Sequence, residues 1–137
     1  MPLAATLNLW APRVLSVLRI VAGLLFLAHG TQKLLGFPAG EMGQPELFSL
    51  MWIAGLIELV AGALLVLGLL TRAAALIASG EMAFAYWMGH AGQDSFPVNN
   101  GGDAAILYCF VFLYLVFAGS GPWSLDALRG RDRKAYR

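Results

Sequence analysis

Four long apolar runs constrain this chain more than any other feature of its sequence. They cover residues 14–35, 49–70, 73–90 and 103–119, and each is close to the roughly 20 residues that a helix needs to cross a bilayer. Because lipid cannot hydrogen-bond to the backbone, such segments have to be helical. Charged residues make up only 12% of the chain, about half the share typical of soluble domains.

The runs predict an all-α polytopic membrane protein, an antiparallel bundle of four transmembrane helices. We expect the spans at about 14–35, 47–70, 72–90 and 102–119. Little sequence is left for a soluble unit, so the prediction is a single integral membrane domain over residues 1–137.

The stretches outside the runs predict where the helices begin and end. Leu3, Leu7 and Trp10 share one helical face, which favours a short interfacial segment before the first span. Residues 37–45 and 91–102 are rich in Gly and Pro and predict irregular loops.

Acidic and hydroxyl side chains stand at positions typical of helix starts. The second helix is expected to start around residues 44–46, where Pro and Glu follow Gln. Asp103 is expected to cap the last span with its carboxylate, and Ser124 and Asp126 to begin a short helix after that span. The short Thr71-Arg72 connection predicts a tight antiparallel hairpin.

Basic residues near the helix ends predict the orientation of the chain. All but one lie on the same side of a four-span arrangement, and Lys33 is the exception. We therefore expect a multi-pass protein of the bacterial inner (plasma) membrane with both termini cytoplasmic. The expected partner is the lipid bilayer, and nothing indicates nucleic acid. The residues on the cytoplasmic side are Arg13, Arg72, Arg129, Arg131, Arg133, Lys134 and Arg137.

Three ionisable residues lie deep inside the apolar runs, Arg19, Glu58 and Glu81. A charge in hydrocarbon costs about 2.5–3.5 kcal/mol on insertion scales, so each needs a partner. Small residues three and four positions away place both glutamates on faces that meet other helices. We expect a buried ion-pair cluster in which Arg19 bonds either glutamate, with Glu81 nearer in depth. A structural pair and a proton or anion site are open alternatives.

His29 and Lys33 lie one turn apart near the other end of the first run. Lys33 is expected to snorkel to the interface. His29 could hydrogen-bond a quinone carbonyl, relay a proton to Glu58, or simply bond a neighbouring helix. His29, Lys33 and Glu58 are thus the candidate ligand-binding residues, and His29 and Glu58 are the candidate catalytic ones. Haem is disfavoured because His29 and His90 form no ligand motif, and no spacing predicts a metal site.

Six short motifs follow one another through nearly the whole chain, and in this order they resemble the DoxX family of small bacterial membrane proteins. Asp103 stands where the family pattern more often has Glu, and Glu81 lies outside the motifs. The motifs are Arg19 with 23–26, His29 to Lys33, Gly55 to Glu58 with Gly62, Gly68 to Arg72, Phe96-Pro97 with Asn100 to Asp103, and Trp123 to Asp126.

The resemblance implies a four-helix membrane protein that serves as an accessory subunit of a membrane oxidoreductase or quinone-linked complex. Founding members are linked to thiosulfate oxidation with quinone as acceptor, and others to complexes that protect against oxidative stress. This chain has no evident redox centre, so the electron carrier would have to be a diffusible quinone or belong to another subunit. Whether the chain is itself catalytic stays open. The alternatives are a non-catalytic scaffold or assembly subunit of a larger complex, and a small proton-coupled carrier working as a homo-oligomer.

Overall fold

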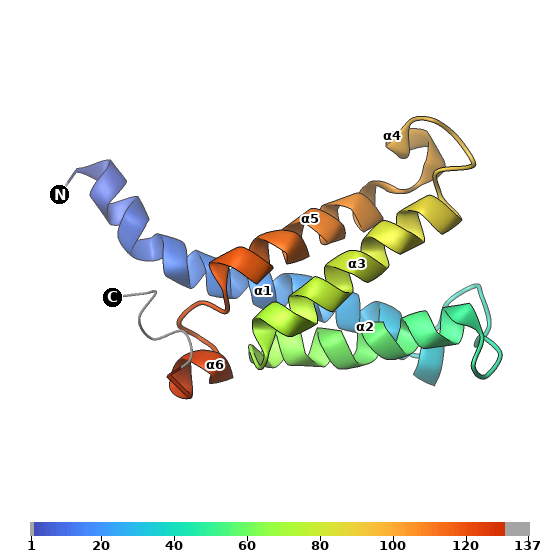
Figure 1. Ribbon diagram of the computed structural model, residues 1–137, viewed down its shortest axis with the longest axis horizontal. Coiled ribbons are helices and arrows are strands. Elements are labelled where there is room, and N and C mark those ends of the chain that lie inside the picture. Colours follow the sequence, from blue (N-terminus) through green and yellow to red (C-terminus); the bar gives the residue numbers. More distant parts are fainter. Residues whose placement is uncertain (1, 131–137) are drawn as a thin grey trace.

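The computed structural model describes residues 2–130. All regular secondary structure in this part of the chain is α-helix, as predicted. Four long helices carry the fold, and two short ones lie in a loop and near the C-terminus (Figure 1). α1 and α2 have the length and hydropathy of membrane-spanning helices, whereas α5 is a shorter apolar helix. The helices are α1 (Leu3–Leu35), α2 (Leu50–Leu67), α3 (Thr71–Gly89), α4 (Pro97–Asn100), α5 (Asp103–Ala118) and α6 (Leu125–Leu128).

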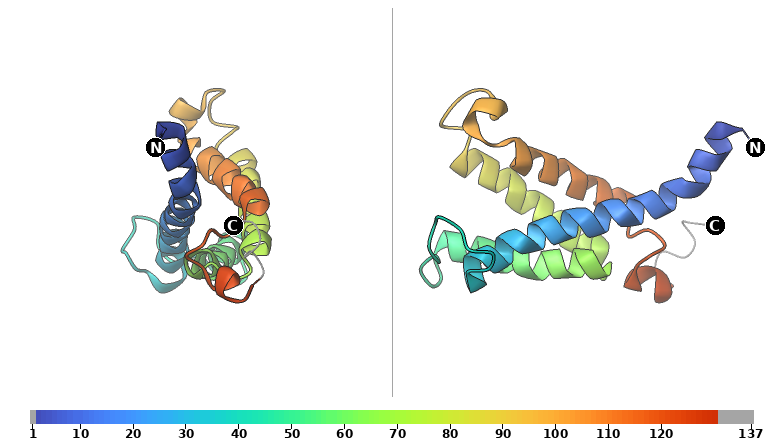
Figure 2. Two further views of the ribbon diagram at one scale, coloured as in Figure 1. Left: turned by 90° about the vertical axis from the view of Figure 1, so that its left-hand side faces the viewer. Right: turned by 180° about the vertical axis from the view of Figure 1, so that it is seen from behind.

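The long helices pack as two pairs, α1 with α2 and α3 with α5. The pairs approach each other at one end of the molecule and diverge toward the other (Figures 1 and 2). We call the first the α6 end, and the second, which carries residues 36–49 and 90–102, the loop end. α2 and α3 meet over a smaller area than the paired helices do. The backbones of α1 and α5 come close at few positions, but Phe26 of α1 packs against Tyr108 and Phe112 of α5. The fold is therefore closed at the α6 end and parted at the loop end.

Glycines bring the backbones of α1 and α2 into direct contact. A Cβ atom added at Gly30 would lie 2.4 Å from the amide nitrogen of Leu59, and one at Gly62 would lie 2.8 Å from the Cα of Leu27. Small residues of this kind allow close helix packing in membranes, where the hydrophobic effect does not drive helices together. The close approach brings the side chains of neighbouring turns within bonding distance of each other.

The N-terminal segment differs from the prediction. The residues expected to form a separate interfacial piece continue into α1, which starts at Leu3 and contains Pro12. Proline lacks an N–H and bends a helix where it interrupts the ladder, and the first turns of α1 are set at an angle to the rest (Figure 2). Leu3, Leu7 and Trp10 are exposed on these turns.

One predicted helix start and one predicted cap are wrong. α2 begins at Leu50, and the hydroxyl of Ser49 accepts a hydrogen bond from the amide of Trp52, so the acid and proline upstream stay in the loop. Gly102 is the N-cap of α5, and the Asp103 side chain makes no capping bond. Asp103 lies in the first turn instead, where a negative charge still opposes the positive end of the helix dipole.

The short helix after the last long helix is confirmed. Ser124 precedes α6 and its hydroxyl accepts a hydrogen bond from the amide of Ala127. Four basic residues used to predict the orientation, Arg131, Arg133, Lys134 and Arg137, lie outside the described residues.

Candidate functional site

Arg19 is fully buried, and two of its nitrogens donate to backbone carbonyl groups. Its Nη1 donates to the carbonyl oxygen of Leu65 at 3.1 Å, and its Nη2 donates to that of Trp123 at 2.5 Å. The first carbonyl lies in the last turn of α2, where a positive charge is favourable. The expected pairing of Arg19 with Glu58 or Glu81 is therefore corrected, because no carboxylate oxygen of either residue accepts a bond from it.

Asp126 secures the same end of the molecule. Its Oδ1 accepts from the amide of Leu70 at 3.0 Å and its Oδ2 from that of Thr71 at 2.9 Å, so the carboxylate satisfies the first N–H groups of α3. Its own amide donates to the carbonyl of Gly68 at 2.9 Å. On the neighbouring turn, Arg72 donates to carbonyls at the end of α5. The motif residues at the α6 end therefore hold the helices together.

Lys33 forms the ion pair that Arg19 does not. Its Nζ lies 2.7 Å from Oε1 of Glu58, and the two side chains are 22% and 3% exposed. Lys33 therefore turns inward from α1 toward α2. The prediction that it snorkels to the interface is wrong. The second oxygen of Glu58, Oε2, is buried and has no hydrogen-bond partner within residues 2–130.

Glu81 brings a second acid to this region from α3. Its carboxylate interacts electrostatically with both Glu58 and Lys33. Both of its oxygens are buried, and the described chain offers neither of them a hydrogen-bond donor. We call Lys33, Glu58 and Glu81 the acidic cluster, since it holds two carboxylates and one ammonium group.

His29 and Tyr108 lie beside the acidic cluster. Nδ1 of His29 is 2.8 Å from the carbonyl oxygen of Leu25, and because a carbonyl only accepts, Nδ1 carries a proton and Nε2 is left for another partner. The ring of Tyr108 on α5 stands edge-on to that of His29, with centroids 6.0 Å apart. Tyr108 also interacts electrostatically with Glu58. The sequence did not single out Tyr108, because it is one of several aromatic residues in an apolar run.

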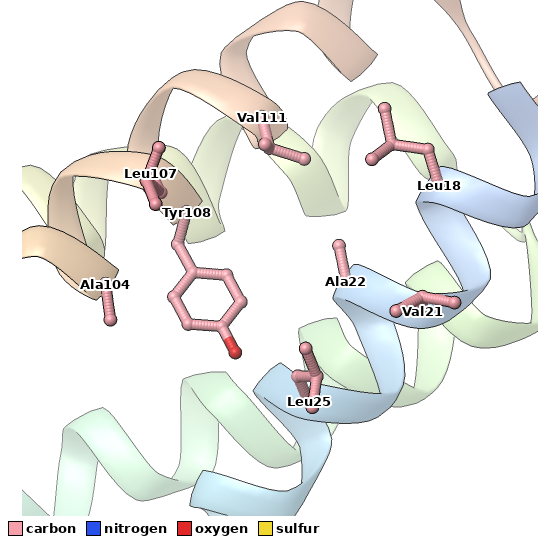
Figure 3. Close-up of a pocket in the computed structure, with 8 residues that line it drawn as sticks. All are labelled: Leu18, Val21, Ala22, Leu25, Ala104, Leu107, Tyr108 and Val111. Carbon is pink, nitrogen blue, oxygen red and sulfur yellow. The ribbon is translucent and has the colours of Figure 1, made fainter.

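An apolar cavity of about 320 Å³ lies between α1 and α5, beside Tyr108. Its walls are aliphatic, and the Tyr108 hydroxyl projects from α5 into the space between the two helices (Figure 3). The cavity is partly open, because the backbones of α1 and α5 come close to each other at few positions. The lining residues are Leu18, Val21, Ala22, Leu25, Ala104, Leu107, Tyr108 and Val111.

His90 lies at the loop end and has a structural partner. Its Nδ1 is 2.9 Å from the carbonyl oxygen of Asn100. The buried amide of Asn100 in turn donates to the carbonyl of Asp94 and accepts from the amide of Gly102. These bonds fold the second loop into a compact turn. Residues 2–130 contain no group of three or more His, Cys, Asp or Glu side chains that could hold a metal ion.

Comparison with known proteins places the chain in a family. The DoxX family profile matches residues 14–91. A protein of Haemophilus influenzae described as uncharacterized is 46% identical over 129 residues, with 88% of this chain and 93% of the relative covered. A protein of Mycobacterium tuberculosis described as an uncharacterized membrane protein is 29% identical over 132 residues, covering 84% and 80%. No solved structure matches the chain. The profile and the first relative agree with the resemblance read from the motifs, and this chain belongs to the DoxX family of membrane proteins.

Proposed function

We propose that this chain is an accessory subunit of a quinone-linked membrane oxidoreductase and that its α1–α5 cavity receives the quinone head group. The observation that carries the proposal is a cavity with aliphatic walls that has the Tyr108 hydroxyl at its side. Small-molecule sites are mostly apolar, with a few placed polar groups, and have volumes of about 300–1,000 Å³. A quinone, which is an apolar ring with two carbonyl oxygens, matches that description.

The polar groups that would face the quinone carbonyls differ from those chosen on the sequence. Tyr108 supplies a hydroxyl, and His29 supplies Nε2, because its Nδ1 is occupied. Glu58 is engaged by Lys33, so these two residues support the site from behind Tyr108 rather than contact the ligand. Electron transfer itself is assigned to a partner subunit, and this chain binds and orients the quinone.

Access to the cavity favours a ligand dissolved in lipid. The cavity lies between α1 and α5, and its lining residues Val21, Leu25 and Leu107 are exposed, so an opening toward the hydrocarbon is available. In the proposed arrangement α1, α2, α3 and α5 all span the bacterial inner membrane. The α6 end faces the cytoplasm, since Arg13, Arg72 and Arg129 lie there. Lys33, the basic residue nearest the opposite end, is paired with Glu58.

Quinone retention tests the proposal. The protein would be purified in native-lipid particles, and the quinone extracted and quantified per protein chain. Tyr108→Phe removes one hydroxyl, and His29→Ala removes the imidazole that offers Nε2. Each should weaken retention about two- to thirteenfold, the equivalent of one hydrogen bond of about 0.5–1.5 kcal/mol. Tyr114→Phe is the matched control, because Tyr114 is on the same helix but exposed. Equal retention by all variants and wild type would refute the assignment.

A scaffold role is the second candidate, and one specific observation favours it. The motif residues Arg19, Asn100 and Asp126 all make bonds that hold the fold together. A scaffold should co-purify with a larger membrane complex whether or not Tyr108 and His29 are substituted. Loss of quinone without loss of the complex would separate the two roles.

A further inference from the structure

The acidic cluster holds more hydrogen-bonding capacity than its own residues use. Glu58 is only 2% exposed, and its Oε2 has no partner among residues 2–130. Both carboxylate oxygens of Glu81 are also buried, and neither has a hydrogen-bond partner among the described residues. Buried polar groups are almost always hydrogen-bonded, and each exception calls for an explanation. Three buried carboxylate oxygens on the packed helices α2 and α3 therefore lack donors, which points to something that binds at them.

The charges of the cluster indicate what binds there. Two carboxylates interact with one ammonium group, that of Lys33, which leaves one negative charge in excess. Burial of an unpaired charge is costly, and two neighbouring acids avoid the cost by sharing a proton. We infer that Glu58 and Glu81 form a buried site that binds one exchangeable proton.

The groups around the site come from every long helix. Lys33 lies on α1 and bonds Glu58, and Tyr108 is the titratable group that α5 contributes near Glu58. Glu81 faces these groups from α3. His29 lies beyond Tyr108, edge-on to its ring. Movement of Lys33 or Tyr108 would therefore change the charge balance at the site directly.

The packing gives the site access from one end only. The Lys33 side chain is 22% exposed and connects the cluster to the loop end, where the helix pairs part. On the way to the α6 end, each helix places a fully buried apolar residue after its cluster residue: Phe26 on α1, Leu65 on α2, Ala78 and Ala75 on α3, and Phe112 on α5. The site therefore exchanges its proton with the loop-end side and is sealed from the α6 side.

Infrared spectroscopy of the quinone-free protein tests the inference. Wild type should show a protonated carboxyl band at neutral pH, equivalent to about one group per chain, which shifts in D2O. Glu81→Gln and Glu58→Gln should each remove or displace the band. Glu46→Gln should leave it, because Glu46 is exposed in a loop. Absence of the band in wild type, or its survival unchanged in both cluster variants, would overturn the inference.

A second measurement needs no variant. A lipid-soluble carbodiimide reacts with protonated carboxyl groups in apolar surroundings, so mass spectrometry of labelled wild type should find the adduct on Glu58 or Glu81, decreasing as the pH is raised. Labelling of neither residue would contradict a proton shared between them. Both readouts are made without quinone, so the proton site and the quinone site can fail separately.

Discussion

Removal of the Lys33 ammonium group is the sharpest test of the acidic cluster. Lys33→Met keeps the length of the side chain but leaves Glu58 without its only bonded partner, which lies 2.7 Å away. The single substitution should therefore destabilise the protein, and the double substitution with Glu58→Gln should recover most of the loss. The comparison is a double-mutant cycle, which measures the interaction between the two side chains.

The magnitude follows from burial. Breaking a fully buried pair by removing one partner costs about 3–5 kcal/mol. Because Lys33 is 22% exposed, we expect a smaller loss for Lys33→Met, about 2–3 kcal/mol, at or below the lower limit of that range. Replacing both partners by uncharged side chains of similar size is often neutral, so the double variant should lie within about 1 kcal/mol of wild type. Any loss caused by Glu58→Gln alone adds to the difference between these two values, so the coupling free energy should be at least about 1–2 kcal/mol.

Reversible unfolding in mixed micelles, followed by circular dichroism, would give the free energies of unfolding. Glu41→Gln is the control, since Glu41 is exposed, and it should change stability by less than about 0.5 kcal/mol. If the two single substitutions simply add in the double variant, Lys33 and Glu58 are not coupled and the cluster as described does not exist.

Three further substitutions test how the helices are held. Asp126→Ala leaves two amides at the start of α3 without their acceptor. It should lower the free energy of unfolding by about 2–4 kcal/mol in the same assay. A loss below about 1 kcal/mol would show that water replaces the carboxylate. Gly30→Val should force α1 and α2 apart and cost at least about 1–3 kcal/mol, while Gly80→Ala, with nothing within 4 Å of an added Cβ, should be neutral or stabilising; equal effects would contradict the contact. Arg72→Ala removes an exposed cap on α5 and should cost only about 0.3–1 kcal/mol, so a much larger loss would mean that this side chain is buried in the membrane-inserted protein.

The helices were predictable because hydropathy reports them directly. α3 and α5 begin and end within a residue or two of the predicted limits, since these are the points where the apolar runs start and stop in the sequence. The start of α2 was not predictable in the same way, because Ser49 caps the helix after a loop that already contains Pro and Glu. Likewise, a proline at position 12 does not by itself tell a kinked helix from a helix boundary.

The partners of the buried charges were harder to predict than their positions. Burial of Arg19 follows from its place in an apolar run, but its acceptors are backbone carbonyls, which every residue possesses and no sequence pattern marks. The Lys33–Glu58 pair depends on how closely Gly30 lets α1 approach α2, which is a property of the packed pair. Tyr108 gains importance only from the cavity beside it.

The link between Asp126 and the start of α3 has a consequence for biosynthesis. The carboxylate that accepts from the Thr71 amide comes 55 residues later in the chain. Until residue 126 has been synthesised, the amides of the α2–α3 turn therefore have to hydrogen-bond to water or lipid head groups. Locking of the nascent protein is a late, post-insertion event, and a transcript truncated just upstream of codon 126 would yield inserted chains that quality-control proteases remove.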